Sequence, residues 1–136
     1  MIAQNAGGST SYYVYNAHGD TTRLLNSSGS VVRTYDNDSF GKSIMNFGTG
    51  ATTPFRYNGQ YTDIDTGLIY LRNRYYDPTT GRFTQEDPAK DGLNWYVYCA
   101  NDPVNFVDPL GLTLTLIGTG DEVWDCLLYT SPSPRD

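Results

Sequence analysis

The chain has 136 residues, enough for one ordinary domain, and its composition excludes several classes of protein. It contains 12 Tyr, 14 Gly and 7 Pro, while charged residues make up only 18%. This mixture favours short strands and tight turns over helices, so we expect an all-β protein. The net charge of −6 and the absence of any run of Lys or Arg argue against a nucleic-acid partner.

The sequence predicts no metal, no cofactor and no membrane insertion by this segment. Cys99 and Cys126 lie in unrelated contexts and form neither a metal-binding pattern nor a disulfide framework. No apolar run is long enough to span a bilayer, and the first residues lack the basic and apolar regions of a signal peptide. His18 is the single histidine, so no Cys–His or Ser–His–Asp constellation is supported. We interpret it as a turn residue.

In chain order, turn signals recur about every ten residues, the rhythm of antiparallel strands that meander through hairpins. We expect a frayed polar end over residues 1–11, followed by strands over 12–14, 21–25, 31–35, 42–47, 55–57, 68–76 and 82–84. The strongest strand signal is LIYLRNRYY at 68–76. One short helix is predicted, LNWYVYCA at 93–100, with Asp91 or Gly92 as its cap and Asn101–Pro103 as its end.

A short pattern repeats along the chain and organises it. Tyr, then Asn or Asp, then polar residues and Gly occur at Tyr15–Gly19, Tyr35–Gly41 and Tyr76–Gly81. Each copy ends a strand on an aromatic ring and then turns, which predicts a stack of hairpins whose rings pack on their neighbours. Such a strip buries little core of its own, so we expect the isolated chain to be poorly stable.

The second half of the chain carries an ordered series of motifs. Between residues 57 and 112 these are TGL, YLR, RYYDP, GRF, DP, GLN, NDPVN and DPLGL. The series resembles the RHS repeat-associated core, and residues 12–56 resemble the YD repeats that precede that core. The resemblance implies a bacterial polymorphic toxin or cell-surface protein, secreted or displayed at the surface. Its repeats would wind into a β-sheet shell, and its core would curl inward as a plug.

The resemblance also implies partners within the same protein. These are upstream repeats that continue the shell and a variable C-terminal effector, often a toxin, with a secretion apparatus to deliver it. The effector would begin within residues 113–125, which are too few to identify it. The last segment, CLLYTSPSPRD at 126–136, resembles the translation of a transposon-type sequencing adapter. We therefore assign no function to it. The alternative for this segment is a Ser/Pro-rich linker.

A self-cleavage site is a further implication of the resemblance. Asp87 and Asp108 resemble the aspartic-protease-like pair of the family, with cleavage between Leu112 and Thr113. Two carboxyl groups that share one proton supply both a general base for water and a general acid, because crowding raises the pKa of one of them. No activity on an external substrate is expected.

The residues around the two aspartates fit this role, but they also fit a simpler one. Pro88 and Pro109 fix the backbone after each Asp, and Gly111 permits a tight turn before the cleaved bond. Lys90 stands where many cleaving members carry Gly, and the spacing to the second motif is one residue shorter. The alternative is that both Asp–Pro pairs only start turns, with the carboxylates accepting hydrogen bonds from backbone amides.

Two further features of the sequence have more than one interpretation. Arg72, Arg74 and Arg82 lie among tyrosines, and we expect their guanidinium groups to stack on rings and pair with Asp rather than to form a sugar or anion site. For the chain as a whole, the alternative function is a cell-surface module that binds carbohydrate or another cell without catalysis. No aligned aromatic sugar platform is visible in the sequence to favour it.

Overall fold

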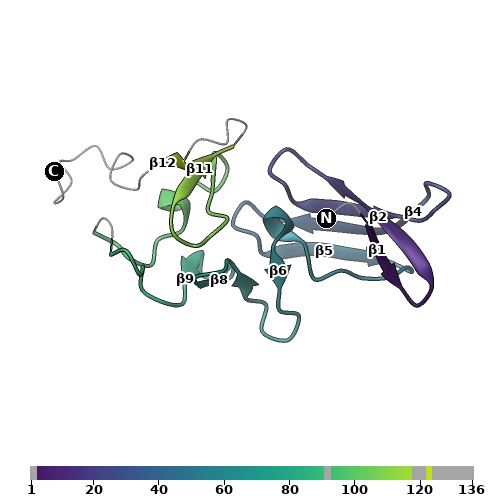
Figure 1. The fold of residues 1–136 in the computed structure, drawn as a ribbon, viewed down its shortest axis with the longest axis horizontal. Helices are drawn as coiled ribbons and strands as arrows, with labels where there is room; N and C mark the ends of the chain where they lie inside the picture. Colours follow the sequence, from purple (N-terminus) through teal and green to yellow (C-terminus); the bar gives the residue numbers. More distant parts are fainter. Residues whose placement is uncertain (1–2, 91–92, 118–121, 124–136) are drawn as a thin grey trace.

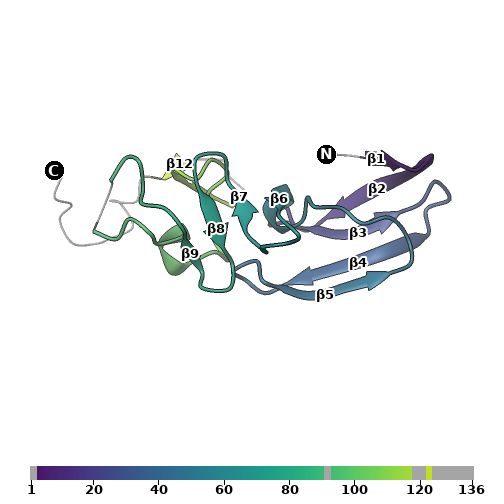
Figure 2. The same cartoon turned by 90° about the horizontal axis from the view of Figure 1, so that it is seen from below.

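The computed structural model describes residues 3–90, 93–117 and 122–123. Across these residues the chain is built from antiparallel β-strands, as the composition predicts. Figures 1 and 2 show an elongated molecule with a five-stranded sheet at one end and two smaller sheets at the other. No helix in the described part of the chain is long and apolar enough to cross a membrane.

The five-stranded sheet consists of consecutive hairpins, so each strand pairs with the next one along the chain. Its strands are β1 (Ala3–Ala6), β2 (Ser9–Tyr15), β3 (Thr21–Leu25), β4 (Val31–Asn37) and β5 (Ser43–Gly48). The strands predicted over 12–14, 21–25, 31–35 and 42–47 are confirmed. The frayed end predicted over 1–11 is wrong for its described residues, because β1 pairs along its whole length with β2.

The hairpin loops repeat one backbone geometry. In loops 16–20, 26–30 and 38–42 an Asn or Asp begins the turn, and a Gly with φ between +83° and +93° follows three residues later. In each loop that Gly donates its amide hydrogen to the carbonyl of the first residue, at 3.0 to 3.1 Å. The same hydrogen bond recurs in loop 56–60, where Arg56 takes the first position. The repeat seen in the sequence is therefore largely a repeat of hairpin loops.

The second half of the chain holds shorter strands in two sheets. The four-stranded sheet contains β6 (Tyr61–Thr62), β7 (Ile69–Tyr70), β8 (Tyr75–Asp77) and β9 (Arg82–Phe83), and the three-stranded sheet contains β10 (Phe106–Val107), β11 (Leu114–Leu116) and β12 (Glu122–Val123). The single strand predicted over 68–76 is wrong. The chain reverses at residues 71–74, where Arg72 has a φ of +68°, and Ile69 then lies opposite Tyr76.

The helix predicted over 93–100 is also wrong. Val97 forms a β-bridge with Arg82, and Phe83 donates its amide hydrogen to Tyr96, so this segment runs alongside β9. The only helical turn here is η2 (Cys99–Asn101), and its residues have positive φ values of 48 to 61°. Tyr98 is extended, with φ −101° and ψ 128°, and its ring is fully buried in the aromatic core. The predicted caps, residues 91 and 92, lie outside the described residues.

An aromatic core joins the two halves of the molecule. Tyr57 comes from the short turn η1 (Tyr57–Gly59), Tyr76 from β8, and Tyr98 from the segment before η2; all three are fully buried. The rings of Tyr76 and Tyr98 stack with centroids 4.0 Å apart, and Phe83 meets both rings edge-on. Offset and edge-on ring contacts add to the gain from burial, so this cluster fixes the short strands around it.

Gly41 offers a test of this core. A Cβ at Gly41 would lie 2.7 Å from the ring of Tyr57, whereas a Cβ at Gly29 would meet nothing within 4 Å, and both glycines have positive φ in equivalent loops. Gly29→Ala therefore reports backbone strain alone and should lower the free energy of unfolding by about 1 kcal/mol.

We expect Gly41→Ala to lower the free energy of unfolding by about 3 kcal/mol, because overpacking adds to the same strain. Denaturant unfolding followed by circular dichroism measures both variants. Equal losses in the two variants would contradict the idea that the loop is fixed by its contact with Tyr57.

Candidate active site

Burial separates the two predicted aspartates from the other Asp–Pro turns. The chain has four Asp–Pro pairs, beginning at Asp77, Asp87, Asp102 and Asp108, and all four are described. Asp87 and Asp108 are each only 2% exposed, whereas Asp77 and Asp102 are partly exposed. Burying a carboxylate is costly unless it is paired and hydrogen-bonded, and starting a turn does not require it.

Arg74 is the charged partner of Asp108. Their side chains are 3% and 2% exposed, and Nη2 of Arg74 lies 3.8 Å from Oδ2 of Asp108. The guanidinium carbon lies 3.5 Å from the ring centroid of Phe83, so the group stacks on the aromatic core. Ring stacking and pairing with Asp, as predicted for the arginines, are thus confirmed for Arg74. Arg72 and Arg82 are exposed.

The guanidinium of Arg74 also organises the surrounding backbone. Its Nε donates to the carbonyl oxygen of Gly111 at 2.7 Å, and its Nη1 donates to that of Trp95 at 2.9 Å. Arg74 therefore joins the second Asp–Pro motif, which contains Gly111, to the extended segment that precedes η2. A planar group with several fixed donors suits this task in a way that an ammonium group does not.

Asp108 lies beside the peptide bond predicted to be cut. Its Oδ1 accepts hydrogen bonds from the amide of Leu112 at 2.9 Å and from the amide of Thr113 at 3.3 Å. The nitrogen of Thr113 is the leaving group if the bond between Leu112 and Thr113 is hydrolysed. One carboxylate oxygen is thus in contact with the atom that must gain a proton.

The turn that carries this bond is tightly held. Gly111 has a φ of +67°, and a Cβ there would lie 2.8 Å from the carbonyl oxygen of Leu71. Asn73 donates to the carbonyl of Leu110 from its side chain at 2.8 Å and from its backbone at 3.3 Å. Pro109 begins the turn that follows Asp108. Gly111 therefore has the positive φ and the close backbone contact that exclude a side chain at this turn.

Asp87 joins the same network through the carbonyl of Trp95. Its amide donates to that carbonyl at 3.0 Å, and Nη1 of Arg74 contacts the same oxygen. Its Oδ1 accepts the amide hydrogen of Ala89 at 2.9 Å, across the turn begun by Pro88. The turn-starting interpretation therefore holds for its local contacts. It does not account for the burial of the carboxylate.

Lys90 adopts the backbone conformation that its position requires. Its φ is +51°, in the left-handed region that favours Gly. Its ammonium lies 5.1 Å from the ring centroid of Trp95 and 3.8 Å from the carboxylate of Glu86. Lys90 thus has a backbone conformation that Gly favours, and it places a cation over the ring of Trp95.

Sequence reasoning did not identify Arg74 as the centre of the site. The available signal was its position two residues before Tyr76, since residues two apart in the strand predicted over 68–76 would face the same side. Asn73 and the carbonyl of Trp95 carried no such signal, since both act through turns. Among the described residues, no three His, Cys, Asp or Glu side chains gather as a metal site.

A strip of antiparallel hairpins that runs into a compact aromatic core defines a YD-repeat shell protein. The family model described as teneurin YD-shell matches residues 1–104, and the chain belongs to this family. It is related to the RHS/YD-repeat proteins that the motifs resemble, and its β-fold is that of the toxin shells. The family predicted from the motifs is thus confirmed.

Particular relatives show how small a part of such proteins this chain represents. It is 40% identical over 109 residues to "Salivary gland surface protein 1" of Aedes aegypti, covering 78% of this chain and 3% of that protein. It is 38% identical over 114 residues to "tRNA nuclease WapA" of Bacillus subtilis strain 168, covering 78% of this chain and 5% of that protein. The crystal structure of TcdB2-TccC3-Cdc42 matches with a TM-score of 0.73 and 32% identity, covering 79% of this chain and 5% of that one.

Replacing Arg74 by Lys should destabilise the site. An ammonium group cannot keep the contacts with Asp108, Gly111 and Trp95 together, and the buried carboxylate would lose its partner. We expect the free energy of unfolding to fall by roughly 3 kcal/mol. Arg72→Lys, on an exposed residue two positions earlier, should change it by less than about 0.5 kcal/mol. Denaturant unfolding compares the two variants, and similar values for both would contradict the anchoring role of Arg74.

Proposed function

We propose that this chain forms the closing end of a YD-repeat shell and that its core hydrolyses the peptide bond between Leu112 and Thr113. The observation that carries the proposal is the position of Asp108. It is buried beside a guanidinium group, and its Oδ1 contacts the amide nitrogen of the bond to be cut. Asp87, which is also buried and whose backbone amide shares the carbonyl of Trp95 with Arg74, is the proposed second carboxyl group.

The proposed reaction gives the two carboxyl groups different roles. The positive charge of Arg74 favours the ionised form of Asp108, which makes Asp108 the general base. It takes a proton from a water molecule as the water oxygen attacks the carbonyl carbon of Leu112. Asp87, as the second carboxyl group of the proposed pair, acts as the general acid toward the carbonyl oxygen of Leu112 and stabilises the charge that develops there.

The second step breaks the carbon–nitrogen bond. Asp108, now protonated, passes its proton to the nitrogen of Thr113, and the amine leaves. The products are a carboxylate on Leu112 and a new amino terminus at Thr113, and both aspartates return to their starting states. Arg74, which binds the carbonyl oxygen of Gly111, holds the preceding peptide in place and acts as a positioning residue.

The segment released by this cut would be an effector enclosed by the shell. Supporting this, the chain is similar to a small part of WapA, which is named as a tRNA nuclease, and to a toxin-complex structure. Similarity to a salivary gland surface protein supports a secreted or surface location. The partners proposed are the protein's own further repeats, its effector and a secretion apparatus.

Asparagine variants test the proposed chemistry. Asn keeps the shape and the hydrogen-bond acceptor of Asp but cannot hold the proton. We expect Asp108→Asn and Asp87→Asn to reduce the cleaved fraction at least about 100-fold, because each removes a general acid–base group. Intact-mass spectrometry of the full chain measures the fraction, and circular dichroism checks that each variant is folded.

Asp77→Asn is the matched control. Asp77 also precedes a Pro, and its Oδ1 accepts the amide hydrogen of Thr79 at 2.9 Å, the same turn contact that Asp87 makes with Ala89. It is partly exposed and lies outside the network of Arg74. Cleavage should therefore be unchanged in this variant. Equal loss in all three variants would mean that the aspartates act only as turn residues.

A further inference from the structure

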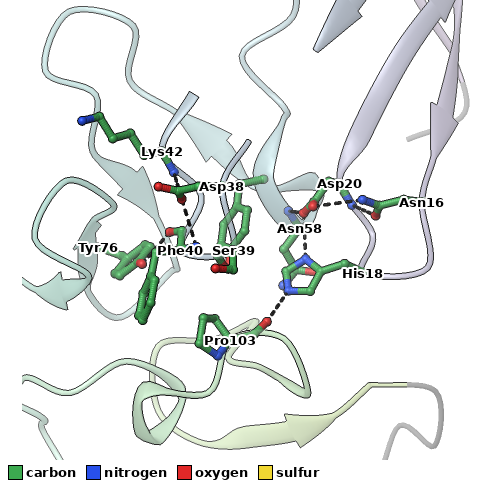
Figure 3. Close-up of polar contacts among 11 residues, drawn as sticks. Asn16, His18, Asp20, Asp38, Ser39, Phe40, Lys42, Asn58, Tyr76 and Pro103 are labelled. Atoms are coloured by element: carbon green, nitrogen blue, oxygen red, sulfur yellow. Dashed lines mark hydrogen bonds and ion pairs between the residues drawn. The ribbon is translucent and has the colours of Figure 1, made fainter. Parts of the chain in front are cut away.

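A second buried polar cluster lies where the hairpin loop 16–20 meets the core. His18, from that loop, approaches Pro103 in the loop between η2 and β10 (Figure 3). A cleft of about 210 Å³ opens beside it, lined in part by His18, Asp38 and Pro103. The His18 side chain is 15% exposed, so solvent protons reach it although most of the ring is buried.

Both ring nitrogens of His18 face hydrogen-bond acceptors. Nδ1 lies 2.7 Å from Oδ1 of Asp20, and Nε2 lies 2.9 Å from the carbonyl oxygen of Pro103. A neutral imidazole carries one donor and one acceptor, whereas the imidazolium carries two donors. Only the protonated ring satisfies both contacts. When the proton is lost, the hydrogen that remains belongs on Nδ1, beside the charged carboxylate, and the contact with Pro103 is the one that fails.

Asp20 is held as a charged acceptor by neighbours besides His18. Its Oδ1 accepts the amide hydrogen of Asn58, at 2.7 Å, and its Oδ2 accepts from the side chain of Asn16, at 3.1 Å. Burial raises the pKa of Asp20, but the hydrogen bonds from His18, Asn58 and Asn16 outweigh it and lower the pKa below 3.8. Asp20 therefore stays ionised across the range in which a histidine titrates.

The remaining groups that face His18 come from two other elements. The ring of Tyr57, from η1, lies 5.0 Å from the imidazole, and Asp38, from loop 38–42, lines the same cleft. Burial holds the pKa of Tyr57 well above its usual range, so this ring stays neutral. For His18, burial lowers the pKa, but the bonds to Asp20 and Pro103 and the charge of Asp20 outweigh it, leaving the pKa above 6.5.

We propose that His18 is a pH-sensitive latch that ties the loop carrying Pro103 to the five-stranded sheet when its ring is protonated. The contact links residues that are 85 apart in the sequence, one in the repeat strip and one in the core. Because the proton is held more tightly in the folded chain, the stabilisation is complete below pH 6.5 and is lost as the pH rises through the folded-state pKa. The latch therefore closes in acid and loosens toward alkaline pH.

Magnetic resonance of the full chain tests this directly, because the sequence contains one histidine and its ring signals need no assignment. We expect a titration midpoint above 6.5, hydrogen on both ring nitrogens in acid, and hydrogen on Nδ1 alone above the midpoint. The amides of Asn105 and Phe106 donate to the carbonyl oxygen of Asp102, so their hydrogen exchange measures how often this loop opens. Between about pH 5 and about pH 8, the rate of hydrogen exchange at these two amides should rise about tenfold beyond its intrinsic pH dependence. This is the effect expected from the loss of one charge-assisted hydrogen bond.

Variants separate the latch from general effects of pH. His18→Gln cannot titrate, so the additional rise in exchange should disappear. Asp20→Asn removes the charge and should lower the midpoint, whereas Asp38→Asn, which lines the same cleft without a contact to the ring, should leave it in place. A midpoint at or below 6.5 in the unmodified chain, or loop exchange that shows no added pH dependence, would overturn the proposal, and neither result requires a variant to fold.

Discussion

The packing of Tyr57, Tyr76 and Tyr98 is the constraint on which the rest of the molecule depends. The hydroxyl groups of Tyr57 and Tyr76 donate to the carbonyl oxygens of Ser39 and Phe40, both in hairpin loop 38–42 of the five-stranded sheet. The stack thus docks the second half of the chain onto the first. Strands of two or three residues have little stability of their own, and they persist here because they converge on these rings.

The candidate active site is in contact with the same aromatic cluster through Phe83. Phe83 packs against Tyr76 and Tyr98 and carries the guanidinium of Arg74 on its face. Arg74 in turn holds Asp108 and the turn containing Gly111. Pairing with Arg74 offsets the free-energy cost of burying the Asp108 carboxylate. Because Arg74 is held by Phe83, the position of this carboxylate beside the amide of Thr113 depends on the aromatic packing.

The sequence predicted the features that depend on local chemistry. Strands β2 to β5 follow from strand-forming segments between Asn, Asp and Gly turn signals, and the two candidate aspartates follow from the ordered motifs around them. It failed where tertiary packing decides the backbone. LIYLRNRYY looks like one strand because no Gly or Pro interrupts it, yet Arg72 adopts a positive φ so that the chain can reverse. The segment around Tyr98 looks helical, but Val97 pairs with Arg82 and Tyr98 is extended, with its ring stacked on Tyr76.

The central proposal is that a water molecule, activated by Asp108, hydrolyses the bond between Leu112 and Thr113. The most direct measurement is to synthesise the full chain in heavy-oxygen water, confirm by circular dichroism that it is folded, and determine the masses of the products. The account predicts a new amino terminus at Thr113 and one heavy oxygen in the new carboxylate of Leu112. A folded chain that remains whole, or that breaks instead at an Asp–Pro bond, would contradict it.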